Sequence, residues 1–162
     1  MIREMKTEDN RAVLNIYKMG LETRNATFET EVPSWQDWDN RHLNHSRFVC
    51  VEHEKVLGWA ALSPVSSRHA YRGVAEISIY IDPLFFRKGI GSQLMERTIA
   101  SSEENGIWSL YSSIFPENKA TLRLHEKFGF RIIGTREKIA QLDGKWRDTL
   151  LLERRSNKPE YQ

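Results

Sequence analysis

A strand that leads through a glycine-rich turn into a helix restricts the fold of this chain more than any other feature. Residues 75–81, AEISIYI, alternate strictly, which predicts a strand with its isoleucines on one face and Glu76, Ser78 and Tyr80 on the other. The turn RKGIGS at 87–92 opens an amphipathic helix that ends at Asn105-Gly106. Backbone N–H groups at the start of such a helix attract anions, so this unit predicts a phosphate-binding turn.

The rest of the chain places this unit within an ordered series of strands and helices. A short strand at 2–5 and a helix capped at Thr7 come first, followed by a helix over 35–43 with Ser34 as its cap and by a hairpin, FVCVEH and VLGWAALS. After the unit come the strand WSLYSSIF, the helix NKATLRLHEKFG and two closing strands. The order β-α-α-β-β-β-α-β-α-β-β predicts an α/β (α+β) class with a mixed sheet and helices on both faces.

Length and charge limit the organisation and the partners of the chain. With 162 residues, we expect a single domain over 1–155 and a disordered tail, SNKPEYQ, over 156–162. A net charge of +2 gives no strong electrostatic case for nucleic acid or a membrane surface as partner. Because no long apolar run or signal peptide is visible, we expect a cytoplasmic protein that acts on small molecules.

The glycine-rich turn alone does not identify a ligand. Gly89 and Gly91 allow the backbone to approach a phosphate closely, but such turns also serve tight packing. Leu94 stands where the dinucleotide fingerprint would have its third glycine, so that motif is absent. The lone cysteine, Cys50, lies in the apolar run FVCV and is expected to be a buried structural thiol.

The turn and its context resemble the GNAT superfamily of N-acetyltransferases, whose pyrophosphate loop reads [QR]xxGx[GA]. Phe86 departs from the leading Gln or Arg of that pattern. The resemblance covers nearly the whole chain and implies a mixed, mostly antiparallel central sheet of about seven strands flanked by four helices. It also implies acetyl-CoA as co-substrate, with its pyrophosphate held at Arg87, Lys88, Gly89, Ile90, Gly91 and Ser92.

Three separated blocks further resemble the phosphinothricin and methionine sulfoximine acetyltransferase branch. They are ATFETE at 26–31, RHAYRGVAEISIYI at 68–81 and GKWRD at 144–148. The resemblance implies that the backbone of Ile79, Tyr80 and Ile81 holds the acetyl thioester and that Asn118 contacts coenzyme A. Members of this branch are usually homodimers, so we expect a homodimer here.

Two titratable residues are candidates for proton transfer. Acetylation needs an unprotonated amine, and Glu76, on the polar face of its strand, is a candidate base; the alternative is a salt bridge to Arg72 or Arg68. His125 lies two helical turns after Asn118 and occupies the position of the family's proton-donating Tyr. It is either a general acid for the departing thiolate or a packing residue.

The expected activity is direct acetyl transfer from acetyl-CoA to the amine of a small amino-acid-like substrate. By resemblance, Arg68 would hold the substrate carboxylate, with Phe28 and Tyr71 completing the pocket. Alternatives are acetylation of a peptide or protein N-terminus, and a fold-alike that binds acetyl-CoA without catalysis. No metal site is expected, because the remaining histidines, His42, His45, His53 and His69, show no ligand pattern.

Overall fold

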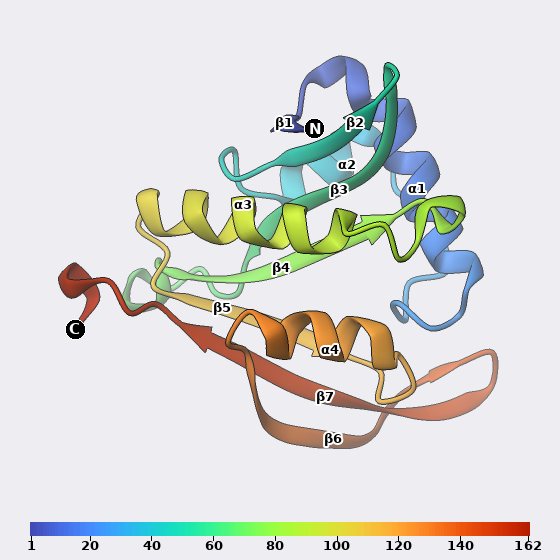
Figure 1. The fold of residues 1–162 in the computed structure, drawn as a ribbon. Helices are drawn as coiled ribbons and strands as arrows, with labels where there is room; N and C mark the ends of the chain where they lie inside the picture. Colours follow the sequence, from blue (N-terminus) through green and yellow to red (C-terminus); the bar gives the residue numbers. More distant parts are fainter.

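In the computed structural model, which describes residues 1–162, all strands join one seven-stranded sheet in the order β1-β2-β3-β4-β5-β7-β6 (Figure 1). Every neighbouring pair is antiparallel except β4 and β5, which are parallel. The predicted order and the mostly antiparallel sheet are therefore confirmed. The elements are β1 (Ile2–Glu4), α1 (Asn10–Glu22), α2 (Trp35–Arg41), β2 (Phe48–Glu52), β3 (Lys55–Pro64), β4 (Val74–Ile81), α3 (Ile90–Glu104), β5 (Ser109–Ile114), α4 (Lys119–Lys127), β6 (Arg131–Leu142) and β7 (Lys145–Arg155).

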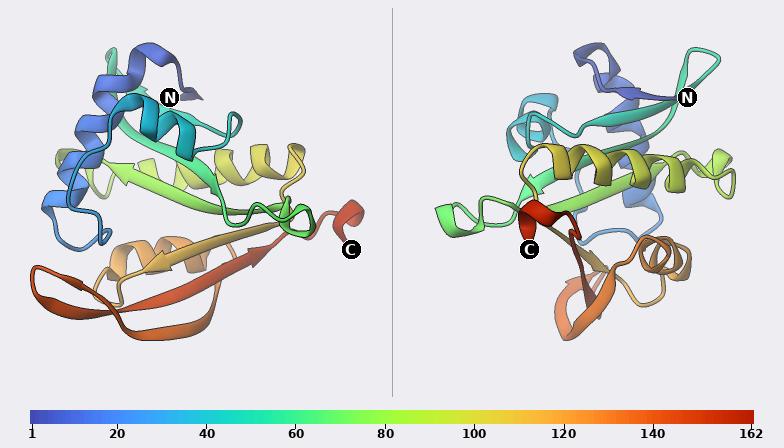
Figure 2. Two further views of the ribbon diagram at one scale, coloured as in Figure 1. Left: turned by 180° about the vertical axis from the view of Figure 1, so that it is seen from behind. Right: turned by 60° about the vertical axis from the view of Figure 1, so that its left-hand side comes forward.

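The helices cover the sheet in pairs, one pair on each face (Figures 1 and 2). Helices α1 and α2 pack on one face, where Val13 and Trp38 are buried against Trp59. Helices α3 and α4 pack on the other, in a larger cluster that includes Met95 and Leu122. Residues from β3, β4, β5 and β7 join that second cluster, so apolar burial holds both halves of the sheet to the same layer of helices.

Strand β4 separates its two faces as the alternating sequence predicts. Ala75 and Ile77 are buried in the cluster under α3 and α4. Tyr80 projects to the other face, where its ring stacks on Trp59 at 5.0 Å and meets Tyr17 edge-on at the same distance. Glu76 is four residues before Tyr80 on the strand, so it projects to the face of α1 and α2 as well.

The sheet opens between β4 and β5. These strands pair only from Val74 to Glu76, opposite Ser109 to Tyr111. Beyond this point β4 continues to Ile81 and β5 to Ile114 without pairing to each other, and Figure 1 shows the two ribbons separating. The edge of β4 that faces this opening thus has no strand partner for its backbone groups.

Two expectations about the chain ends are wrong. The first helix is not capped at Thr7, because residues Thr7–Asp9 form a separate 3-10 turn before α1. The tail at 156–162 is not disordered. The Ser156 hydroxyl donates to the Glu103 carboxylate at 2.7 Å, and the Tyr161 hydroxyl donates to the Glu103 carbonyl at 2.8 Å, so the tail packs on the end of α3.

Candidate active site

Glu76 lies at the last residue pair that joins β4 to β5, where the opening between the strands begins. Its neighbours across the sheet are Ser63 on β3 and Tyr111 on β5. The carboxylate takes part in no ion pair and no hydrogen bond within the chain, so the salt bridge to Arg68 or Arg72 does not form. Burial raises the pKa of Glu76 above its ordinary value. A half-buried, unpaired carboxylate of this kind is suited to accept a proton.

The glycine-rich turn has the backbone geometry of an anion-binding site. Gly89 precedes α3 with φ of 78°, and no side chain caps the helix. A Cβ on Gly89 would meet nothing closer than the Gln93 side chain at 4.0 Å, so space is open beside the turn. Arg87 also has a positive φ, 64°, which is uncommon outside glycine. The first N–H groups of α3 have no intrahelical partner and are free to bind phosphate oxygens.

The other residues of the turn differ in their surroundings. Arg87 and Lys88 are exposed, as is Phe86 at the position where the family has Gln or Arg. Ile90 is buried among core residues, and the Ser92 hydroxyl accepts from the Lys127 ammonium at 3.1 Å.

Gly91 serves packing as well as access. A Cβ there would lie 3.1 Å from Leu124 and 3.2 Å from Ile81, so a larger residue would disturb the contact between α3, α4 and β4. A substitution at this glycine therefore does not separate ligand binding from stability.

His125 is a buried side chain. Its ring is 4% exposed and meets Phe130 edge-on at 4.8 Å. Nδ1 lies 2.7 Å from the Thr121 carbonyl oxygen and donates to it, which leaves Nε2 as an acceptor without a partner. Burial lowers the pKa of His125. The contacts of the buried ring with Thr121 and Phe130 fit the packing alternative, and the general-acid role stays a prediction.

Asn118 caps α4 and also reaches the segment between α1 and α2. Its side-chain oxygen accepts from the Thr121 N–H at 3.4 Å, and its amide nitrogen donates to the Asn25 carbonyl at 3.2 Å. Asn118 thus stands beside the opening between β4 and β5, after the end of β5, and links it to the loop over residues 23–34. We name this segment the α1–α2 loop.

The three residues expected to bind the substrate do not come together within one chain. Phe28 packs edge-on against Phe115, just beyond the carboxyl end of β5, with ring centroids 4.9 Å apart. Arg68 and Tyr71 are exposed and precede the amino end of β4. Six residues of β5 separate these two ends, roughly 20 Å at about 3.3 Å per residue. Figure 2 shows the two loops at opposite ends of the sheet.

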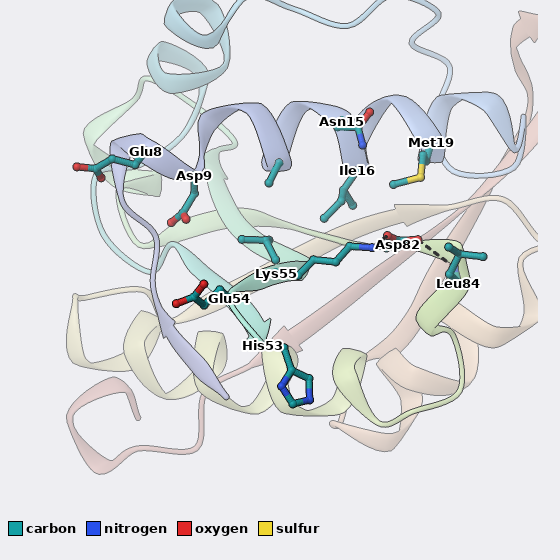
Figure 3. A pocket seen from close by; sticks show the side chains of 12 residues that line it. Glu8, Asp9, Asn15, Ile16, Met19, His53, Glu54, Lys55, Asp82 and Leu84 are labelled. Carbon is teal, nitrogen blue, oxygen red and sulfur yellow. Dashed lines mark hydrogen bonds and ion pairs between the residues drawn. The ribbon is translucent and has the colours of Figure 1, made fainter.

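A cavity of about 520 Å³ lies between α1, the β2–β3 turn and the residues just after β4 (Figure 3). Lys55 spans it and pairs with Asp82 at 3.6 Å. Acidic and basic side chains line it without forming a group suited to a metal ion. Glu76 is not among its lining residues, so we do not place the reaction there.

Arg147 is the one residue at this site that sequence reasoning missed, although it lies in the quoted block GKWRD. From β7 its guanidinium donates to the Arg24 carbonyl at 2.8 Å and to the Asn25 side chain at 3.1 Å. These partners are more than 120 residues away along the chain. No local pattern could have indicated them.

The fold and the open pair of strands define an acyl-transferring enzyme, and the chain belongs to the acetyltransferase (GNAT) family, whose model matches residues 10–130. YwnH of Bacillus subtilis, which carries a provisional phosphinothricin acetyltransferase name, is 35% identical over 94% of this chain and 97% of its own length. The L-methionine sulfoximine/L-methionine sulfone acetyltransferase of Pseudomonas aeruginosa is 25% identical over 94% of this chain and 92% of its own length.

A solved structure is similar over the same extent. The GNAT superfamily phosphinothricin acetyltransferase of Sinorhizobium meliloti, in complex with acetyl-CoA, superimposes with a TM-score of 0.87 at 25% identity. The similarity covers 96% of this chain and 87% of that one.

Proposed function

We propose that this protein transfers the acetyl group of acetyl-CoA to the amine of a small amino-acid-like compound of the phosphinothricin or methionine sulfoximine type. The observation that carries the proposal is the unpaired, half-buried Glu76 at the point where β4 and β5 part. The named activities of the Pseudomonas and Sinorhizobium relatives support the substrate class. Acetyl-CoA bound to the Sinorhizobium enzyme supports the donor.

The residues present fit acetyl-CoA. The backbone N–H groups from Gly89 to Ser92 would bind the pyrophosphate, since no side chain caps them and open space adjoins Gly89. Arg87 and Lys88 would add positive charge in place of the missing Gln or Arg. The unpaired edge of β4 from Ile79 to Ile81 would hold the thioester by backbone hydrogen bonds.

Glu76 would act as the general base. It accepts a proton from the substrate ammonium, directly or through one water, and the free amine attacks the thioester carbon. The N–C bond forms, the C–S bond breaks, the nitrogen loses its second proton to water, and the coenzyme leaves as thiolate, which takes a proton from water. The raised pKa of Glu76 brings the carboxyl closer to the pKa of the amine and makes this transfer less unfavourable. No covalent enzyme intermediate is needed.

A homodimer is part of the proposal. Strand β6 is one of the two edge strands of the sheet, with β1 at the other edge, and it is exposed along most of its length. Long edge strands with apolar side chains are usually covered by a partner. The apolar side chains exposed on β6 and on the adjoining part of β7 are Ile132, Ile133, Ile139 and Trp146. Trp146 is 59% exposed in one chain.

We place the enzyme in the cytoplasm, where acetyl-CoA and small amines are available. No helix combines the length and apolar character needed to cross a bilayer.

Release of free coenzyme A thiol with a panel of amines tests the proposal. We expect turnover with phosphinothricin or methionine sulfoximine and little with peptides. If only peptides are acetylated, the proposed substrate class is wrong, but the protein is still an acetyltransferase. If acetyl-CoA binds but no amine is acetylated, the protein is a non-catalytic binder of the coenzyme.

A further inference from the structure

We propose that Arg147 is a positioning residue that fixes the α1–α2 loop against the carboxyl end of β5 and the amino end of β7 and thereby shapes the amine pocket. The role in amine binding rests on the proposed function, whereas the fastening of the loop does not. Arg147 lies on β7, outside the residues discussed above for acetyl transfer.

The guanidinium of Arg147 joins three separate parts of the chain. It donates to the Arg24 carbonyl at 2.8 Å and to the Asn25 side-chain oxygen at 3.1 Å, both in the loop. It also pairs with the Glu117 carboxylate at 3.1 Å, just before α4. Its plane lies over the Phe115 ring, with Cζ 3.9 Å from the centroid. A planar group with several donors can satisfy all four contacts at once, and an ammonium cannot.

Burial shows that this is more than a surface ion pair. The Arg147 side chain is only 18% exposed, although its partner Glu117 is 63% exposed. The energetic weight therefore falls on the loop contacts and on the stacking against Phe115, because an exposed carboxylate contributes little. Phe115 in turn packs against Phe28 of the loop, so the guanidinium holds both the backbone and the aromatic side chain of this segment.

The loop reaches the face of the sheet that carries Glu76. Burial is the main cause that raises the pKa of the Tyr80 hydroxyl, and the carboxylates of Glu76 and of loop residue Glu29 both add to it. Glu29 also raises the pKa of Tyr17, after the effect of burial. Contact geometry agrees with this placement, because a Cβ on Gly20, near the end of α1, would lie 2.6 Å from ring carbons of Tyr80. The loop therefore starts beside the face that carries Glu76, where the amine would lie.

A second contact ties the loop to the donor side. Asn118, expected at the coenzyme, donates to the carbonyl of Asn25, the same residue whose side chain accepts from Arg147. If coenzyme binding draws the Asn118 amide away, Arg147 still holds the loop at Arg24 and Asn25. The remaining contacts of the loop are the Arg24–Asp143 ion pair and the packing of Phe28 on Phe115. The clamp would therefore matter most in the complex that binds the amine.

Limited trypsin digestion tests the clamp without any assay of activity. Trypsin cuts after Arg24, whose backbone carbonyl is one of the acceptors. For Arg147→Ala we expect cleavage there to accelerate about tenfold or more, the factor for losing two hydrogen bonds of ordinary net strength. Arg147→Lys should be cleaved at a rate between those of the wild type and Arg147→Ala. Arg131→Ala is the matched control, since it removes an exposed arginine that pairs with Glu153 on the neighbouring strand. If Arg147→Ala keeps the wild-type melting temperature and is cleaved after Arg24 at the wild-type rate, the clamp is overturned.

Steady-state kinetics test the role in amine binding. We expect Arg147→Ala to raise KM for the amine about tenfold or more and to change the Kd of acetyl-CoA less than about twofold. Asn25→Ala, which removes one acceptor and leaves Arg147 in place, should give a smaller shift in the same direction. If KM for the amine and Kd of acetyl-CoA rise by the same factor, the role of Arg147 is merely structural. If no amine is acetylated by the wild type, the proposed function fails while the digestion result still decides the clamp.

Discussion

Replacing Glu76 by Gln should produce an enzyme that is nearly inactive and yet more stable at neutral pH. The substitution keeps the shape of the side chain and removes only its ability to take a proton. Loss of a general base lowers kcat by roughly 10²–10⁴, or about 2.7–5.4 kcal/mol of barrier. Because Glu76 has no ion pair or hydrogen bond in the chain, no structural partner is left without its contact, and the whole loss should belong to the chemical step.

The sign of the stability change follows from burial. The pKa of Glu76 is raised in the folded protein, so the protonated form is favoured and its stabilisation is complete below the ordinary value of 4.5. That stability is lost as pH rises through the raised pKa, because a buried carboxylate must then ionise. The Gln variant lacks this penalty. It should melt above the wild type at pH 8, and the difference should shrink as the pH falls toward 4.5.

Thiol release over a pH series, with thermal melting of the same samples, measures both effects. Glu96→Gln on the exposed face of α3 is the matched control and should alter neither. The activity of Glu76→Gln should recover partly at high pH, where the amine loses its proton without help. Wild-type kcat at pH 7, or a lower melting temperature at pH 8, would refute the assignment of Glu76 as an unpaired base.

Three further substitutions test the turn, the buried histidine and the free edge. Gly89→Ala should weaken acetyl-CoA binding by calorimetry, because φ of 78° costs a side chain about 1 kcal/mol and the turn must relax; unchanged affinity would remove the turn from the site. His125→Phe should leave kcat and its pH profile within about threefold while shifting the melting temperature, and a kcat loss of about 10² or more would restore the acid role. Ile139→Asp should convert a dimer to a monomer in sedimentation, and a wild-type monomer would exclude this interface.

The sequence allowed the fold to be predicted where a local period or a cap determined it. The alternation in AEISIYI correctly placed Ile77 in the core and Glu76 on the opposite face. Ser34 caps α2 as expected, accepting from the Asp37 N–H at 3.2 Å. Cys50 is buried, as its apolar surroundings indicated.

Contacts between distant segments could not be predicted in this way. The tail reads as polar and unstructured, yet Tyr161 finds the Glu103 carbonyl 58 residues away. The expected substrate residues show the same limit: Arg68 and Phe28 lie in blocks that resemble one family branch, but a strand's length separates them in one chain. Resemblance identified the segments that matter, and only three-dimensional structure could show which of them meet.

The opening between β4 and β5 also determines how the two halves of the molecule cohere. Three residue pairs supply the only backbone ladder between strands β1–β4 and strands β5–β7. The cluster that contains Leu62, Met95 and Leu152 spans both halves, so side-chain packing carries most of the cohesion there. Packing yields to small rotations more readily than a hydrogen-bonded ladder does. The substrates would thus enter where the two halves have the fewest backbone hydrogen bonds between them. A bound coenzyme would itself connect the two halves at this place.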